Sequence, residues 1–203
     1  MKKFQLTILI LLLVTLSLYG SEKQVIVEIF TNSACPACVA AHTALDNYLQ
    51  SENGNKVEFV FYHTEWPVHA DKLYEHNISD SKKKNKFYGP YFSSPQTFFN
   101  GNHVENNYSQ WKSELNRLIV EDNKFELQLS GSRKDSSFTI QVDVTNKSDS
   151  NHSDLIINYV VVEDVFYAAV NGINDHKNVM RKIVDPEGTP FGRNSQKVLL
   201  RFI

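Results

Sequence analysis

Two cysteines separated by two residues constrain this chain more than any other feature. Cys35 and Cys38 are the only cysteines among its 203 residues. The apolar run over residues 25–30 predicts a strand before them, and residues 39–50 predict a helix after them. Thiols at this spacing on a strand-to-helix turn can close into a disulfide and reopen with little main-chain movement. Because the free N–H groups and the dipole of a helix start favour a thiolate, the pair predicts thiol–disulfide exchange.

The first twenty residues have the pattern of a secretory signal peptide. Lys2 and Lys3 precede an almost wholly apolar stretch, and Gly20 then leads into a polar segment. The stretch is short for a bilayer span, which needs about 20 residues. We therefore expect export and cleavage after residue 20, with an uncleaved membrane anchor as the alternative.

Export changes the meaning of the cysteine pair. In an oxidising compartment two cysteines usually form a structural bridge. A bridge across two intervening residues closes a very small loop, however, and stabilises little through chain entropy. A redox role for Cys35 and Cys38 is therefore favoured over metal binding and over an inert bridge.

The charge of the chain argues against a nucleic-acid partner. Its formal charge is −2, and it falls to −4 once residues 1–20, with their two lysines, are removed. The sequence contains no basic stripe. The length suffices for one large domain or two small ones.

Residues 21–122 predict a domain of alternating strands and helices. A second strand is expected over residues 57–61, a helix near 71–86, a hairpin at Asn100-Gly101 and a last helix after it. Short alternating strands then follow over residues 123–203, with a buried-type strand at 155–162. This pattern predicts a β-sandwich-like domain. Because the chain stops inside an apparent strand, we expect that domain to be incomplete.

Several motifs resemble a known superfamily. The strand, Cys35-Pro36-Ala37-Cys38 and the later Ser94-Pro95 are similar to a thioredoxin fold. The finer pattern resembles secreted bacterial thioredoxin-like proteins, including some described as outer-membrane proteins. In its β module, residues 171–181 resemble a loop of that group. The resemblance implies that Pro95 is cis, lies beside the cysteines and exposes the main chain of Ser94 to an extended substrate.

The resemblance also implies roles for individual residues. Cys35 is expected to be the attacking nucleophile, with its sulfur exposed at the helix start, and Cys38 is expected to resolve the mixed disulfide. Glu28 interrupts an apolar strand and is the candidate to accept the proton of Cys38. Among the histidines, His63 ends the second strand, from which it could approach the site, but a surface or core histidine with its own partner is favoured. His42 is expected to be an ordinary helix residue.

The leading interpretation is an α/β thioredoxin-like oxidoreductase, exported to the periplasm or the outer surface. Its partners would be client proteins with thiols or disulfides and a redox partner protein. No cofactor, metal or nucleic acid is expected, and association with a membrane stays open. Two alternatives remain. One is copper or zinc bound by the cysteines and a histidine such as His63. The other is a non-catalytic surface protein on the same scaffold.

Overall fold

The computed structural model describes residues 24–134, 137–148, 155–191 and 195–202. The signal peptide expected over residues 1–20 lies outside these ranges and stays a prediction. The elements up to residue 122 are β1 (Val25–Thr31), α2 (Cys38–Leu49), the 3-10 turn η2 (Gly54–Lys56), β2 (Val57–His63), α3 (Lys72–Glu75), α4 (Ile78–Tyr88), β3 (Gln96–Phe99), β4 (Asn102–Val104) and α5 (Tyr108–Leu118). Beyond them lie β5 (Phe125–Lys134), β6 (Ser137–Asn146), β7 (Ile156–Phe166), β8 (Asp175–Pro190) and β9 (Ser195–Phe202).

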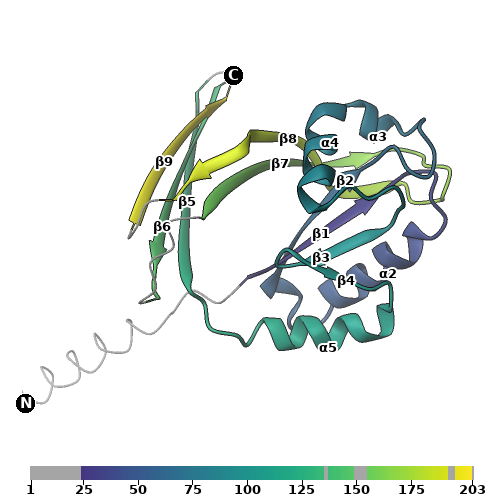
Figure 1. Cartoon of the computed structure of the whole chain (residues 1–203), viewed down its shortest axis with the longest axis horizontal. Coiled ribbons are helices and arrows are strands. Elements are labelled where there is room, and N and C mark those ends of the chain that lie inside the picture. The colour runs from purple at the N-terminus through teal and green to yellow at the C-terminus, as the bar shows by residue number, and fades with distance from the viewer. Residues whose placement is uncertain (1–23, 135–136, 149–154, 192–194, 203) are drawn as a thin grey trace, which may run out of the picture.

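A six-stranded sheet in the order β4-β3-β1-β2-β8-β7 forms the centre of the molecule (Figure 1). β1 pairs in parallel with β2 and antiparallel with β3. As expected from its apolar run, β1 is buried on both faces, since every residue of it except Ile26 is buried. The order of strands and helices up to α5 is the one the sequence predicts, except that two helices instead of one follow β2, so the expected α/β fold is confirmed.

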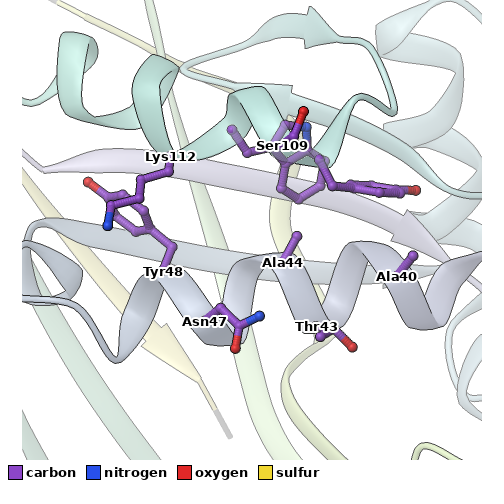
Figure 2. A pocket seen from close by; sticks show the side chains of 9 residues that line it. Ala40, Thr43, Ala44, Asn47, Tyr48, Ser109 and Lys112 are labelled. Carbon is purple, nitrogen blue, oxygen red and sulfur yellow. The ribbon is translucent and has the colours of Figure 1, made fainter.

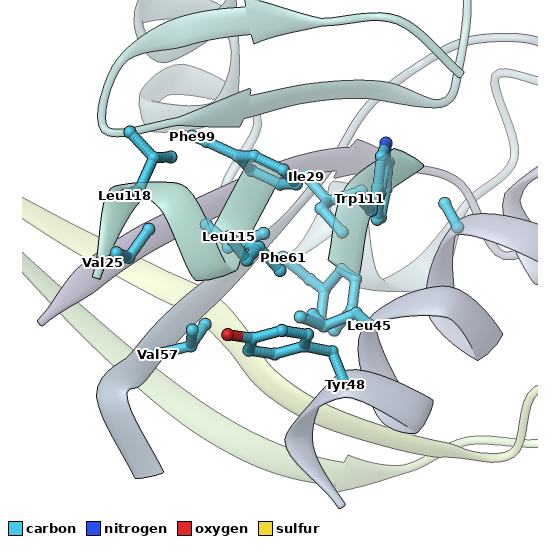
Figure 3. Packing of buried hydrophobic residues seen from close by; sticks show 12 residues of the cluster. Val25, Ile29, Leu45, Tyr48, Val57, Phe61, Phe99, Trp111, Leu115 and Leu118 are labelled. Carbon is cyan, nitrogen blue, oxygen red and sulfur yellow. The ribbon is translucent and has the colours of Figure 1, made fainter. Parts of the chain in front are cut away.

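α2 and α5 cover one face of this sheet. The apolar side chains of β1 and β2 meet those of the two helices in one core cluster (Figure 3). Its largest members are Trp111, Tyr48, Phe61 and Phe99. Trp111 is buried and donates its indole N–H to the carbonyl of Glu105. It therefore belongs to the core, as expected for an aromatic residue at helical spacing.

α4 covers the opposite face over a smaller, aromatic cluster. Phe30, Tyr62 and Phe98 pack there beside Tyr88 of α4. The expected single helix near residues 71–86 is in fact two helices, α3 and α4. The turn between them ends at Asn77, whose side chain accepts a hydrogen bond from the N–H of Asp80 and so caps α4.

β3 and β4 form the hairpin that Asn-Gly predicts. Asn100 and Gly101 both have positive φ, of 47° and 80°, as a two-residue turn of this kind requires. Asn100 also exchanges hydrogen bonds with Ile26, to which it donates its main-chain N–H and from which its side-chain oxygen accepts one. The hairpin is thereby fastened to the start of β1.

The strands beyond residue 122 divide between two sheets. β7 and β8 extend the central sheet, because β8 pairs with β2 and places Val179 opposite Phe61. β5, β6 and β9 form a second, three-stranded antiparallel sheet. Val142, Val144 and Phe191 are the buried centre of a small core that also includes residues of β7. A separate β-sandwich-like domain over 123–203 is therefore not confirmed, since two of its expected strands belong to the first sheet.

The strand expected as buried at residues 155–162 is an edge strand. β7 pairs only with β8 among the described strands, and most of its side chains are half-buried or exposed. Its apolar residues are explained in part by the first half of the strand, where Ile157 and Tyr159 pack against the small core of the second sheet. A continuous apolar run thus indicated burial that the strand's edge position does not provide.

Asp80 links the two parts of the chain. Its buried carboxylate accepts hydrogen bonds from the Ile183 N–H at 2.9 Å and from Lys182 Nζ at 3.0 Å, both in β8. We expect Asp80→Ala to lower the free energy of unfolding by about 2–3 kcal/mol, since bonds to a charged acceptor are lost. Chemical denaturation monitored by circular dichroism measures this.

The matched control is Asp122→Ala, because Asp122 is exposed. It should change stability by less than about 0.5 kcal/mol. Equal effects of the two substitutions would contradict the assigned role of Asp80.

Candidate functional site

Cys35 and Cys38 form a disulfide at the start of α2, with their Cα atoms 5.4 Å apart. A short turn precedes the helix, in which the Cys35 N–H donates to the carbonyl of Asn32 at 3.0 Å. The Cys38 N–H lies 3.1 Å from the Cys35 sulfur and donates to it. A main-chain donor aimed at this sulfur stabilises negative charge on it once the bond is reduced. Cys35 is thus the cysteine whose thiolate the main chain stabilises.

The Ser94-Pro95 segment lies directly against this sulfur. The Ser94 carbonyl oxygen is 3.5 Å from Cys35 Sγ, and the Ser94-Pro95 peptide bond is cis. The Ser94 hydroxyl is 3.0 Å from the hydroxyl of Thr64, which ties the proline segment to the end of β2. The expected neighbourhood of proline and cysteines is therefore present. Substrate binding by Ser94 and Pro95 stays a prediction.

The expected exposure of the Cys35 sulfur is wrong. Cys35 is 1% exposed and Cys38 is 0% exposed. The sequence indicated exposure because a residue in front of a helix normally faces solvent. It gave no sign that a segment more than 130 residues later, around Asn171, would bind the same loop.

Two polar side chains fix the loop between β1 and Cys35. Asn32 donates its side-chain amide to the carbonyls of Thr64 and Val68, at 2.8 and 2.9 Å. Asp71 accepts the N–H of Ser33 at 2.7 Å. Both residues are fully buried. The segment that follows β2 therefore holds the loop, in addition to the bonds within the loop itself.

Asp71 is ionised although it is buried. Burial by itself would raise the pKa of its carboxyl group. Hydrogen bonds from His63 Nδ1, at 2.8 Å, and from the N–H groups of Ser33 and Leu73 outweigh burial and lower the pKa. A carboxylate with several donors keeps its charge, and that charge holds the loop before Cys35.

Glu28 lies on the sheet face covered by α4. Its carboxylate accepts hydrogen bonds from the hydroxyl groups of Tyr62, at 3.0 Å, and of Tyr88. It also forms an ion pair with Lys84 Nζ at 2.8 Å. Burial, followed by the adjacent Glu28 charge, raises the pKa of both tyrosines, so they remain hydroxyl donors. None of these contacts of Glu28 involves Cys38. The expected role of Glu28 as proton acceptor stays a prediction.

Three buried histidines gather behind the loop. His63 and His176 place their rings 5.4 Å apart, and His42 stacks on Phe61 while bonding the Thr31 hydroxyl at 3.1 Å. Burial lowers the pKa of His176, and the neighbouring His63 lowers it further. Burial also lowers the pKa of His42 to about 3, with smaller contributions from the other two histidines. The neutral imidazoles of His42 and His176 therefore support this side of the site.

His42 and His176 are residues whose place in the structure the sequence reasoning missed. His42 was expected to be an ordinary helix residue, yet it joins α2 to the end of β1. For His42, the helical spacing from Ala41 and Leu45 was a usable signal of burial. For His176, the sequence offered only its place in a segment that resembled a family loop.

The histidines and cysteines that the structure describes do not gather into a metal-binding group. Within the described ranges, no group of three or more His, Cys, Asp or Glu side chains is arranged to hold a metal ion. His63 uses Nδ1 for Asp71, and Cys35 faces Ser94 instead of a histidine. The copper or zinc alternative consequently has no structural support here.

The turn between β7 and β8, residues 167–174, completes the site. Asn171 donates its main-chain N–H to the carbonyl of Ser33 at 3.0 Å. Its side-chain amide donates to the carbonyls of Asn32 and Cys35, each at 3.3 Å. Figure 1 places this turn beyond the end of β1, next to the start of α2. The chain beyond residue 122 thus contributes directly to the surroundings of the cysteines.

A groove of about 570 Å³ lies elsewhere, between α2 and α5 (Figure 2). Ala40, Ala44 and Thr43 line it from α2, and Ser109 and Lys112 line it from α5. Neither cysteine lines this groove. The redox pair therefore does not lie at the bottom of this hollow.

Comparison with solved structures finds a similar fold. The chain resembles HBP35 of Porphyromonas gingivalis with a TM-score of 0.74 and 15% sequence identity, over 90% of this chain and 65% of that one. The chain therefore spans less than two thirds of that protein. No protein-family model and no curated protein matches the chain. This likeness shows a shared fold, and in this chain Cys35 and Cys38 form a disulfide within it.

No helix in the described part of the chain is long and apolar enough to span a membrane.

Asp71→Asn tests how the loop before Cys35 is held. The new amide would direct a donor toward the Ser33 N–H or His63, which are donors to the carboxylate. We expect a loss of about 1–3 kcal/mol in unfolding free energy. Asp122→Asn is the control and should be close to neutral. An unchanged stability of Asp71→Asn in urea denaturation would refute the assigned role.

The buried His42 predicts a stability that depends on pH. Above its ordinary pKa of 6.5 the imidazole is neutral in the folded and the unfolded chain, so it has no effect. As the pH falls from 6.5 toward about 3, only the unfolded chain takes up the proton. Stability should then decrease by up to about 1.4 kcal/mol per pH unit.

His42→Gln should flatten this dependence, because glutamine takes up no proton. Urea denaturation between pH 7 and 4 measures the slope. His76→Gln is the control, since His76 is exposed. A slope that is the same in His42→Gln and in the unaltered protein would contradict the neutral state of His42.

Proposed function

We propose that this protein is an exported thiol–disulfide oxidoreductase that exchanges disulfides with client proteins through Cys35 and Cys38. One observation carries the proposal. The disulfide lies at a helix start, with the Cys38 N–H donating to Cys35 Sγ and the carbonyl of Ser94, next to the cis proline, 3.5 Å from the same sulfur. A purely structural bridge needs neither a thiolate-stabilising donor nor a main-chain acceptor beside its sulfur.

The exchange proceeds in two steps that balance. In the reduced protein, the Cys35 thiolate attacks one sulfur of a client disulfide and forms a mixed disulfide, while the other client sulfur leaves as a thiolate. The Cys38 thiolate then attacks Cys35 Sγ, which forms the Cys35–Cys38 bond and releases the second client thiolate. The client gains two electrons and the protein loses two. Run in reverse, the same steps oxidise a client dithiol.

Exposed apolar side chains around the site support a polypeptide as the client. Phe92, two residues before Ser94, is 69% exposed, and Val68, whose carbonyl binds Asn32, is also exposed. Trp66 packs edge-on against Phe92. Apolar surface beside a main-chain acceptor suits an extended peptide segment better than a small polar thiol. The redox partner would use the same surface.

Export to the periplasm or the outer surface belongs to this proposal. The signal-like residues 1–20 support it, and an oxidising compartment permits the disulfide to persist. Association with a membrane would also depend on those residues.

A non-catalytic surface protein is the second candidate. The burial of Cys35, at 1% exposure, favours it, since a client cannot reach this sulfur in the closed arrangement. Catalytic turnover of a client disulfide or dithiol distinguishes the two candidates, because only the oxidoreductase would show it.

Cysteine substitutions test the proposal. In Cys38→Ser the nucleophile remains but the resolving thiol is lost, so we expect a stable mixed disulfide with a disulfide-containing client such as insulin. In Cys35→Ser neither the mixed disulfide nor turnover should appear. Non-reducing electrophoresis detects the adduct, and insulin reduction and oxidation of a dithiol peptide measure turnover.

The unaltered mature protein is the reference for both variants in the two turnover assays. Absence of turnover in both directions, together with no adduct in Cys38→Ser, would contradict the proposed activity and favour the second candidate.

A further inference from the structure

We propose that the turn of residues 167–174 is a lid that closes the disulfide and has to move before Cys35 can react. This inference deepens the proposed function. Only the biological purpose of the lid rests on that function. The closed state itself is visible in the structure, where Cys35 is 1% exposed although Pro36 and Ala37 beside it face solvent.

A single residue holds the lid to the cysteine loop. The three hydrogen bonds that Asn171 donates end on the carbonyls of three loop residues, Asn32, Ser33 and Cys35. Two of them come from the side-chain amide and are 3.3 Å long. Bonds of this length lie just beyond the usual range for N–H···O hydrogen bonds and are weak. The contact between lid and loop is therefore concentrated and can be broken locally.

The lid is organised to move as a unit. The Tyr167 N–H donates to the Asn174 carbonyl at 2.9 Å, which closes the base of the turn. Inside it, the Gly172 N–H donates to the Ala169 carbonyl, and the Ile173 N–H donates to the side-chain oxygen of Asn171. These internal bonds do not involve the cysteine loop. They can persist when the Asn171 contacts open.

The two sides of the lid differ in character. Val170 is 86% exposed, whereas Ala169 is buried. Asn171 meanwhile occupies three main-chain carbonyls of the loop that carries Cys35. The lid therefore restricts movement of this loop as long as these bonds are kept.

The test measures reduction of the disulfide by dithiothreitol in the intact, oxidised protein. Dithiothreitol gives two electrons and two protons to Cys35–Cys38 and closes into its own cyclic disulfide. The free thiols are counted over time by alkylation and mass spectrometry. This readout does not need a client, so it is independent of the proposed enzymatic activity.

Asn171→Ala removes both side-chain bonds to the loop and should accelerate reduction about 10-fold. Asn171→Asp keeps the size and the acceptor for Ile173, but it directs an oxygen at two carbonyls, so it should also accelerate reduction. Asn174→Ala is the control on the same turn, because Asn174 is exposed and binds Tyr167 through its main chain. It should react at the rate of the unaltered protein.

Unchanged rates in Asn171→Ala and Asn171→Asp would overturn the lid, as would equal acceleration in Asn174→Ala. Circular dichroism checks that each variant is folded, and Asn171→Asp replaces Asn171→Ala if the latter unfolds. Faster reduction without any client turnover would support the lid while the proposed oxidoreductase fails. Client turnover with unchanged reduction rates would leave the oxidoreductase standing and overturn the lid.

Discussion

The parallel pairing of β1 with β2 determines where the site can form. Thr31 and His63, the last residues of the two strands, lie opposite each other in this register. The two segments that leave these ends are therefore neighbours: one leads to Cys35, and the other passes through Thr64 to Asp71. The Asp71 carboxylate and the Asn32 amide join them with buried hydrogen bonds. Every further contact of the cysteines depends on this junction.

Polar groups inside the junction impose a cost that the surrounding core has to offset. Among the described residues, His63 Nε2 is buried without a hydrogen-bond partner. Unpaired buried polar atoms destabilise a fold by about 1–3 kcal/mol each. The turn of residues 167–174 leads directly into His176 near the start of β8.

The sequence was sufficient for the local features and insufficient for the long-range ones. The cysteine spacing, the hairpin at Asn100-Gly101 and the apolar run of β1 are local patterns, and each predicted its element correctly. The pairing of β8 with β2 joins residues more than 100 positions apart and leaves no periodic signal. For the same reason the contact between Asn171 and the Cys35 loop could not be predicted from the sequence. Glu28 shows the same limit, since a charge within an apolar strand does not reveal which face it occupies.

The reduction potential of the Cys35–Cys38 pair tests the central claim most directly. Equilibration of the full mature protein with glutathione or dithiothreitol buffers, followed by alkylation, gives this value. The account predicts a reversible two-electron transition within the range of exchanging proteins, about −120 to −270 mV. A potential below about −300 mV is typical of structural disulfides and would contradict it.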